Sequence, residues 1–165
     1  MVNKEPVWII RDTREKQDYG WTFNKSDVFA GMKKEALESG DYTLSVFQNE
    51  KFLWIDRKHS WSEIVMNLFG KEDRHRFYEC LERTRLYKYK YIILEVKLDD
   101  IYYIKIPKLR IKPDAILKKL IEISIEYNIN IIFASKYGHI FCLSLLKRML
   151  ERWNKIHEKT HQTSI

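Results

Sequence analysis

The fold of this chain is decided by residues 40–47, GDYTLSVF, and residues 51–58, KFLWIDRK. Residues 42–47 and 51–58 are rich in aromatic and β-branched side chains, and three polar residues separate them, so they predict two strands joined as a hairpin. Gly40 and Asp41 form the predicted turn at the start of the first strand. Side chains alternate along a strand, so Asp56 and Lys58 should face one side of the sheet and Arg57 the other.

The rest of the chain alternates further strands with helices. Short apolar runs predict strands at residues 7–10, 91–96, 101–106 and 129–133. Apolar spacing and capping residues predict helices over 60–68, 73–87, from Pro113 to about residue 127, and from His139 to about residue 156. This order indicates a single α/β domain with a mixed sheet. We expect that domain to span 1–156 and a flexible tail to occupy 157–165, which lack apolar periodicity.

Composition excludes several classes of protein. The 165 residues suit one domain, and 45% hydrophobic residues are enough for a packed core. Cys80 and Cys142 belong to no Cys-x-x-Cys motif, which excludes a disulfide scaffold and a zinc finger and indicates a reducing, intracellular compartment. No apolar stretch approaches the roughly 20 residues of a membrane span, and the N-terminus lacks the apolar core of a signal peptide.

The net charge of +7 is unevenly distributed. Residues 1–107 contain 19 basic and 18 acidic side chains, whereas residues 108–165 contain 11 and 5, so the basic surplus lies in the C-terminal third. A basic surface is typical of proteins that bind a polyanion such as nucleic acid or an anionic membrane face. It is equally common in Lys-rich proteins that have no such partner.

The predicted hairpin brings together groups suited to metal-assisted phosphodiester hydrolysis. Asp41 would lie beside Asp56, so two carboxylates could share a divalent metal while Lys58 stabilises negative charge on a phosphate. An acid-x-Lys triplet alone is weakly specific, because an exposed charged strand end contains the same residues. Glu95-Val96-Lys97 is a rival triplet at the end of another predicted strand, and composition does not choose between the two.

Three sequence elements together resemble the nuclease domain of the XPF family of structure-specific endonucleases. The family signature is Gly-Asp, a spacer, Glu-Arg-Lys, three residues and Asp. The matching segments here are GDY, WIDRKHSWSEIVMNL and RFYECLERTRLYKYKYIILE, and Asp12-Thr13-Arg14-Glu15 resembles the family's D-x-R-E element. The resemblance continues through Pro113 to about residue 150. It implies a restriction-endonuclease-like fold, in which helices flank a central mixed sheet within a single domain.

The resemblance also implies roles for individual residues. The implied metal ligands are Asp12, Asp41 and Asp56, and the implied catalytic set is Asp12, Glu15, Asp41, Asp56 and Lys58. Arg14 and Arg57 match site arginines that contact phosphate or hold the acids in place, Arg76 matches a basic helix position, and Glu95 becomes a supporting acid.

A basic stripe on the helix after the motif extends the predicted DNA contacts. The full set of predicted DNA-binding residues is Arg14, Arg57, Arg74, Arg76, Arg83, Arg85 and Lys88. The helical members of this set would suit a solvated helix face equally well, with Glu79 and Glu82 as their partners. Two tryptophans flank the motif: Trp54 should be core, whereas Trp61 would either stack on a base or staple its helix.

Two positions depart from the family signature. Asp56 stands where the family has Glu, and Ser62 stands where it has Asp, with Glu63 beside it. We expect a Mg²⁺-dependent DNA endonuclease, with Mn²⁺ able to substitute, that acts on branched, flap or single-strand-containing DNA in repair, recombination or replication. The alternatives are a catalytically weak DNA-binding or scaffold subunit and a sequence-specific restriction-type endonuclease.

The resemblance shapes the expected partners as well. The chain ends before the tandem helix-hairpin-helix module of larger relatives could fit, so we expect a free-standing, phage-like or prokaryote-like nuclease. The last predicted helix carries more apolar residues than one face needs, which favours a homodimer through the C-terminal helices. DNA is the expected partner, with no membrane and no small-molecule cofactor. The expected location is the cytoplasm or nucleoid, or the host cytoplasm for a viral protein.

Overall fold

A six-stranded mixed sheet forms the middle layer of the domain. The computed structural model describes residues 5–105 and 110–162. The sheet order is β2-β1-β3-β4-β5-β6. The strands are β1 (Ile9–Asp12), β2 (Met32–Glu35), β3 (Tyr42–Leu44), β4 (Leu53–Lys58), β5 (Tyr89–Leu94) and β6 (Asn130–Phe133).

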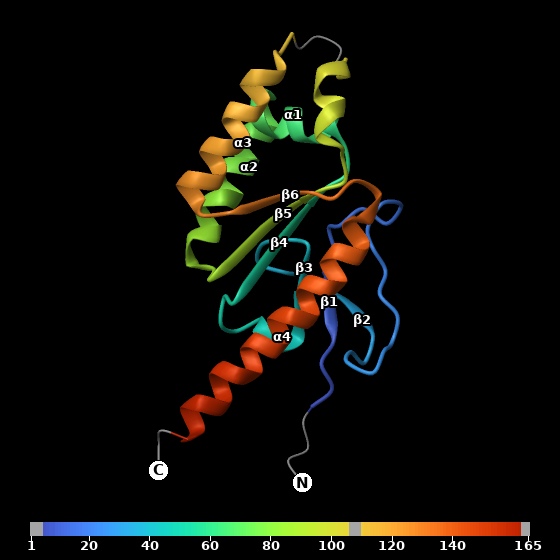
Figure 1. The fold of residues 1–165 in the computed structure, drawn as a ribbon, viewed down its shortest axis with the longest axis vertical. Helices are drawn as coiled ribbons and strands as arrows, with labels where there is room; N and C mark the ends of the chain where they lie inside the picture. Colours follow the sequence, from blue (N-terminus) through green and yellow to red (C-terminus); the bar gives the residue numbers. More distant parts are fainter. Residues whose placement is uncertain (1–4, 106–109, 163–165) are drawn as a thin grey trace.

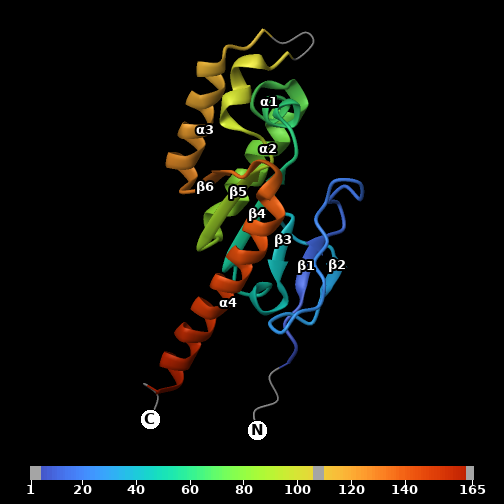
Figure 2. The same cartoon turned by 45° about the vertical axis from the view of Figure 1, so that its right-hand side comes forward.

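Helices cover both faces of this sheet. α1 (Trp61–Phe69), α2 (Lys71–Arg83) and α3 (Pro113–Tyr127) lie on one side, and the long α4 (Gly138–Gln162) crosses the other side (Figure 1, Figure 2). The predicted single α/β domain with a mixed sheet flanked by helices is confirmed. None of the helices in the described ranges is both long and apolar enough to cross a membrane.

The predicted hairpin is present, and its second strand ends beside the carboxyl ends of two parallel strands. β3 and β4 pair antiparallel, with Tyr42 opposite Ile55. β4 pairs parallel with β5, and β5 with β6, so that Lys58, Leu94 and Phe133 lie in register. The carboxyl ends of these three strands therefore lie along one margin of the sheet, which we call the C-terminal edge.

Two hydrophobic cores lie on the two faces of the sheet, and β4 contributes to both by alternation. Leu53 and Ile55 pack in the core beneath α4, whereas Trp54 packs in the core beneath α1, α2 and α3. The same alternation sends Asp56 toward the α2 side and Arg57 toward the α4 side.

The predicted roles of the two tryptophans can now be separated. Trp54 is a core residue, as expected. Trp61 is also buried, and its indole nitrogen donates to the Lys97 carbonyl at 3.2 Å, so it staples α1 rather than standing free to stack on a base.

The apolar surplus of the last helix is used inside the domain. Cys142, Leu145, Leu146, Met149 and Leu150 are all buried against the sheet. Ile140 is the only apolar side chain of α4 that is exposed among those the structure describes. The homodimer through the C-terminal helices stays a prediction. The excess of exposed apolar surface on which that prediction was based is not found on the described part of α4.

The predicted strand at 101–106 is wrong. Leu98–Tyr103 forms a 3-10 helix, η3, and Ile106 lies outside the described residues. The residues are apolar enough for a strand, but their burial does not alternate: Ile101 is buried, whereas Tyr102 and Tyr103 are exposed.

The end of the chain also differs from expectation. α4 continues to Gln162, so residues 157–162 are helical, while residues 163–165 lie outside the described residues. The flexibility predicted for the tail stays a prediction. The His157 ring lies 4.0 Å from the Trp153 ring, and its Nε2 is 3.5 Å from Glu50. These contacts extend the helix beyond the last apolar positions of its sequence pattern.

Candidate active site

A small polar cleft lies where β4 ends at the C-terminal edge. Its volume is about 110 Å³. It is lined by Arg14, Glu15, Lys16, Asp41, Asp56, Arg57, Lys58, His59 and Glu63. Larger hollows of about 330 and 380 Å³ border α2 and α3, but the carboxylates that line them, Glu122 and Glu126, pair with basic residues of the helix surface. The small cleft is therefore identified as the candidate site by the acidic and basic side chains that line it, and not by its volume.

The turn before β3 places Asp41 against β4. Gly40 has a φ of +84°, and a Cβ there would lie 2.9 Å from the Ile55 carbonyl oxygen, so this turn needs glycine. The Asp41 amide donates to that same carbonyl at 2.7 Å, and Asp41 Oδ2 accepts from the Arg57 amide at 2.7 Å. The structure therefore brings Asp41 and Asp56 together, as the hairpin predicts.

The electrostatics of the two aspartates favour a nearby cation. Burial and the charges of Asp56 and Glu15 raise the pKa of Asp41 well above its usual range. Burial also raises the pKa of Asp56, and Lys58 opposes that rise. Lys58 Nζ lies 2.7 Å from Asp56 Oδ2, yet this buried oxygen accepts no well-aligned hydrogen bond, so we treat the contact as an ion pair.

Lys58 remains a cation in this setting. Burial alone would lower the pKa of its ammonium group, but the charges of Asp56 and Asp41 raise it above the ordinary lysine range. A permanently protonated lysine beside buried carboxylates is suited to stabilising negative charge and is unsuited to accepting a proton.

Two glutamates complete the acidic lining of the cleft. Burial raises the pKa of Glu15, whose carboxylate lies 3.2 Å from the Arg57 guanidinium. Glu63 lies on the first turn of α1, where its Oε2 accepts from the His59 amide at 2.8 Å and its own amide donates to the Ser60 hydroxyl at 3.2 Å. The sequence assigned no site role to Glu63, although its position three residues after the helix cap was a signal that it turns back toward the strand end.

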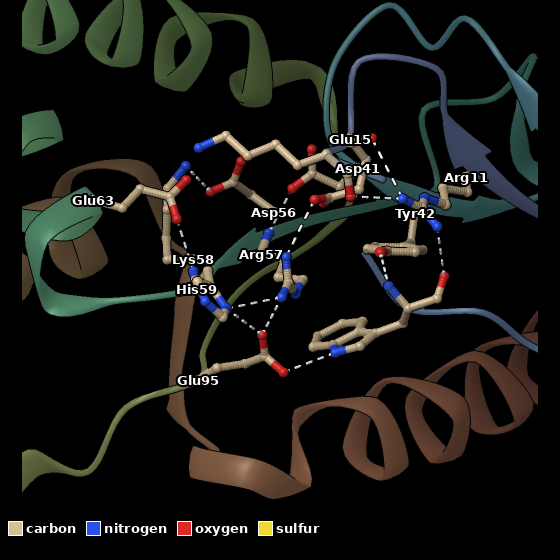
Figure 3. Close-up of polar contacts among 12 residues, drawn as sticks. Arg11, Glu15, Asp41, Tyr42, Asp56, Arg57, Lys58, His59, Glu63 and Glu95 are labelled. Carbon is tan, nitrogen blue, oxygen red and sulfur yellow. Dashed lines mark hydrogen bonds and ion pairs between the residues drawn. The ribbon is translucent and has the colours of Figure 1, made fainter. Parts of the chain in front are cut away.

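Arg57 holds the acids in place from inside the protein. Its side chain is 3% exposed and pairs with both Glu15 and Glu95 (Figure 3). Its guanidinium also lies 5.2 Å from the centre of the Trp21 ring, and the Trp21 indole donates to Glu95 at 2.9 Å. This burial leaves no surface for DNA, so we withdraw the predicted DNA contact of Arg57 and retain the alternative, a positioning role with Glu95 as its support.

Asp12 does not reach the cleft. Its Oδ1 accepts from the backbone and the Nε of Arg14 at 2.7 and 2.8 Å, and its Oδ2 accepts from Arg14 Nη2 at 2.9 Å and from the Leu37 amide at 2.7 Å. Burial alone would raise the pKa of Asp12, but the bonds from Arg14 and Leu37 hold it below its usual value. Both oxygens thus stabilise the loop that carries Arg14 and Glu15, and these contacts do not support the predicted metal-binding and catalytic roles of Asp12, which stay predictions.

The predicted basic stripe divides between two faces of α2. Arg76 and Arg83 lie one helical turn on either side of Cys80, whose sulfur contacts Ser39 Oγ at 3.4 Å beside the Gly40 turn. Arg14, with its side chain 65% exposed, lines the cleft itself. These three arginines remain candidates for DNA contact.

The other three basic residues lie away from the cleft. Arg74 lines a hollow that Lys119 of α3 also lines, and Arg85 pairs with Glu126 of α3 at 2.8 Å. Lys88 precedes β5, at the end of the strands opposite Lys58. Their predicted contact with DNA near the cleft is not supported by where they lie.

The cleft fits an open magnesium site. No group of three or more Asp, Glu, His or Cys side chains within the described ranges is arranged as a ready metal cage. Mg²⁺, however, usually takes one or two carboxylates and completes its shell with water and substrate phosphates. Asp41 and Asp56 could provide two such oxygen ligands, with Glu15 beside them and with Asp56 Oδ2 held by its ion pair with Lys58.

Comparison with known proteins gives two results. The family model of the ERCC4 domain matches residues 11–141. The structure of XPF from Aeropyrum pernix matches with a TM-score of 0.61 at 19% identity, over 92% of this chain and 69% of that one. XPF from Aeropyrum pernix in complex with DNA matches with a TM-score of 0.57 at 18% identity, over 89% and 66%.

The structural match bears on the fold. The chain spans about two thirds of the length of these XPF chains and shares their arrangement of a mixed sheet flanked by helices. No curated protein matched the sequence.

Proposed function

The chain belongs to the ERCC4 domain family, and on that basis we propose that it is a DNA endonuclease that uses Mg²⁺ to hydrolyse phosphodiester bonds. One observation carries the proposal: Asp41, Asp56 and Lys58 converge in one cleft at the end of β4. A non-catalytic scaffold subunit would have no need for two neighbouring carboxylates that repel each other when both are ionised.

Each cleft residue has a chemical task in this proposal. Asp41 and Asp56, with Glu15 beside them, would hold Mg²⁺ or Mn²⁺. When bound, the metal polarises the scissile phosphate and lowers the pKa of the attacking water. The ammonium group of Lys58 would orient that water or stabilise the charge that develops on the phosphate.

The surrounding residues keep this arrangement rigid. Arg57 fixes Glu15 from the α4 side, and Glu95 fixes Arg57. Glu63 fixes the backbone of His59, directly after Lys58. A first layer of reacting groups supported by hydrogen-bonded neighbours is the arrangement that precise catalysis requires.

DNA would approach the cleft over arginines on its rim. We propose that Arg14, Arg76 and Arg83 contact the phosphate backbone, which positions DNA without reading its sequence. DNA is the proposed substrate because the chain belongs to the ERCC4 domain family and XPF in complex with DNA has a similar fold. We propose branched, flap or single-strand-containing DNA, in repair, recombination or replication, from the resemblance to structure-specific endonucleases.

A single panel of substrates tests the proposal. The wild-type protein and Asp56→Asn are incubated with Mg²⁺ or Mn²⁺ and with single-stranded, duplex, nicked, flap and splayed DNA of one sequence. We expect internal cuts near the branch point by the wild type and none by the variant. Binding without cleavage of any substrate would indicate a scaffold subunit, and cuts at a fixed sequence in plain duplex would indicate a restriction-type enzyme.

A further inference from the structure

The exposed tyrosines are concentrated on one side of the protein. All ten tyrosines lie in the described ranges, and six of them are buried or half-buried. The four exposed ones are Tyr19 (47%), Tyr102 (67%), Tyr103 (80%) and Tyr137 (56%).

These four tyrosines lie in or against segments that follow the carboxyl ends of β4, β5 and β6, the strand ends where the cleft lies. Tyr102 and Tyr103 belong to η3, which follows β5, and Tyr137 ends the 3-10 turn η4 (Ser135–Tyr137), which follows β6. The ring of Tyr19 stacks on that of His59, which follows β4, at 4.1 Å. We call these four residues the tyrosine rim.

A hydrogen bond joins the first turn of α1 to the residue that precedes η3. Trp61 opens α1, the helix that carries Glu63, and bonds to the carbonyl of Lys97 immediately before η3. Figures 1 and 2 both show the lime-coloured η3 beside the first turn of α1. η3 therefore packs against the helix whose Glu63 lines the cleft.

Tyr102 and Tyr103 have no task within the fold. Neither residue belongs to a hydrophobic core, and within the described ranges neither side chain makes a ring contact or a hydrogen bond. Lys97 and Lys105 lie exposed on either side of them, and the ammonium of Lys136 lies 5.3 Å from the Tyr137 ring. Aromatic rings interleaved with lysines are suited to nucleic acid.

The chemistry of stacking selects one kind of nucleic acid. Every base has a π-face that an aromatic side chain can cover, whereas in a duplex those faces are covered by neighbouring base pairs. We propose that the tyrosine rim binds the unpaired bases of a single-stranded DNA segment adjoining the cleft, with Tyr102 and Tyr103 as the main stacking surface. This inference rests on the proposed nuclease function and assigns the unpaired strand of its substrate a binding surface on the protein.

Equilibrium binding without divalent metal tests the proposal separately from cleavage. Fluorescence anisotropy compares wild type, Tyr102→Ala/Tyr103→Ala and Tyr102→Phe/Tyr103→Phe with three labelled DNAs: single-stranded oligothymidine, an abasic strand of the same length, and a duplex. Ile121→Ala/Ile125→Ala is the matched control, because this exposed apolar pair lies on α3.

The alanine pair should bind oligothymidine about tenfold more weakly, the order expected for the loss of base stacking. It should bind the abasic strand and the duplex as wild type does. The phenylalanine pair should restore binding, and the control should bind all three DNAs normally.

Three results would overturn the rim proposal. They are unchanged oligothymidine binding by the alanine pair, an equal loss on all three DNAs, and a change in sedimentation coefficient in place of a change in DNA binding, which would mean that a second copy of the chain covers the rim. If wild type cut no DNA while the stacking result held, the nuclease proposal alone would fail.

Discussion

Asp41 and Asp56 are carboxylates for which burial and like charge both oppose ionisation. In the absence of metal, the folded protein must either protonate one of them or tolerate two buried negative charges with a single lysine beside them. Ionisation of both aspartates therefore destabilises the folded protein when no metal is bound. The free energy of unfolding of the metal-free protein should depend on pH for this reason.

The stability of the metal-free protein should fall as pH rises above the ordinary aspartate pKa of 3.8. Because the pKa of Asp41 is raised in the folded state, the folded state binds more protons than the unfolded state in that range, so raising the pH favours unfolding. Asp41→Asn should remove part of this slope, so the variant should be more stable than wild type at pH 8 and no more stable at pH 4.

Urea denaturation in EDTA from pH 4 to pH 8 measures this difference. Asp99→Asn, at an exposed position, is the control and should follow the wild-type curve. Identical pH profiles for wild type and Asp41→Asn would show that Asp41 is not under the strain assigned to it.

Asp12 should behave as a structural residue. Asp12→Ala leaves the Arg14 guanidinium and the Leu37 amide without their buried acceptor, so the free energy of unfolding should fall by roughly 3 kcal/mol. Calorimetric titration with Mn²⁺ should give wild-type affinity for folded Asp12→Ala and a much weaker affinity for Asp56→Asn. The reverse order of affinities would return Asp12 to the metal site.

The sequence predicted the cleft residues that a strand pattern can place. Asp41, Asp56 and Lys58 were predictable because hairpin pairing and side-chain alternation fix their positions. Asp12 was not, because an arginine two residues later can turn back onto a carboxylate, and only the loop geometry decides whether it does so. The burial of Arg57 depends on Glu95 and Trp21, which are distant in sequence, so no local pattern could reveal it.

The helices and strands that could be predicted from the sequence are those with a periodic pattern of apolar residues. The hairpin, β5, β6 and all four helices were predictable from it. β2 was not, because its sequence Met-Lys-Lys-Glu has no apolar alternation, and backbone pairing with β1 holds it at the sheet edge. η3 was mistaken for a strand because its residues are apolar and aromatic, and the sequence does not show that its two tyrosines are exposed.

α4 supports the active site through its first residue. A Cβ on Gly138 would lie 2.7 Å from the Trp21 ring and 3.1 Å from Glu95 Cγ, so the helix approaches the network around Arg57 as closely as glycine allows. In an ordinary helix Gly→Ala is stabilising by about 1 kcal/mol.

Gly138→Ala should therefore act in the opposite direction. Overpacking against Trp21 should lower the free energy of unfolding by roughly 1–3 kcal/mol and should reduce cleavage by displacing Arg57 and Glu15. Ile140→Ala, on the same helix with its side chain 60% exposed, should change neither measurement. A stabilised Gly138→Ala protein would contradict the proposed contact between helix and site.

At the scale of the whole molecule, the site lies at the end of β4, the strand that contributes side chains to both hydrophobic cores. Asp56 and Lys58 leave β4 on the α2 side, while Arg57 leaves it on the α4 side and is held there by Glu95. The proposed reacting groups thus lie on one face of the sheet and the residues that hold Arg57 lie on the other. Because all three side chains come from consecutive residues of β4, a shift of Arg57 should also displace Asp56 and Lys58. The tyrosine rim continues the same edge, so cutting and the proposed strand binding share one face.

The most direct test of this account is the single-turnover rate of DNA cleavage as a function of Mg²⁺ concentration, for wild type and for Asp56→Asn. We predict no cleavage in EDTA, a wild-type rate that rises and saturates with Mg²⁺, and a rate for the folded variant that is lower by at least about a hundredfold throughout. A folded Asp56→Asn protein that cleaves at the wild-type rate would contradict the central claim.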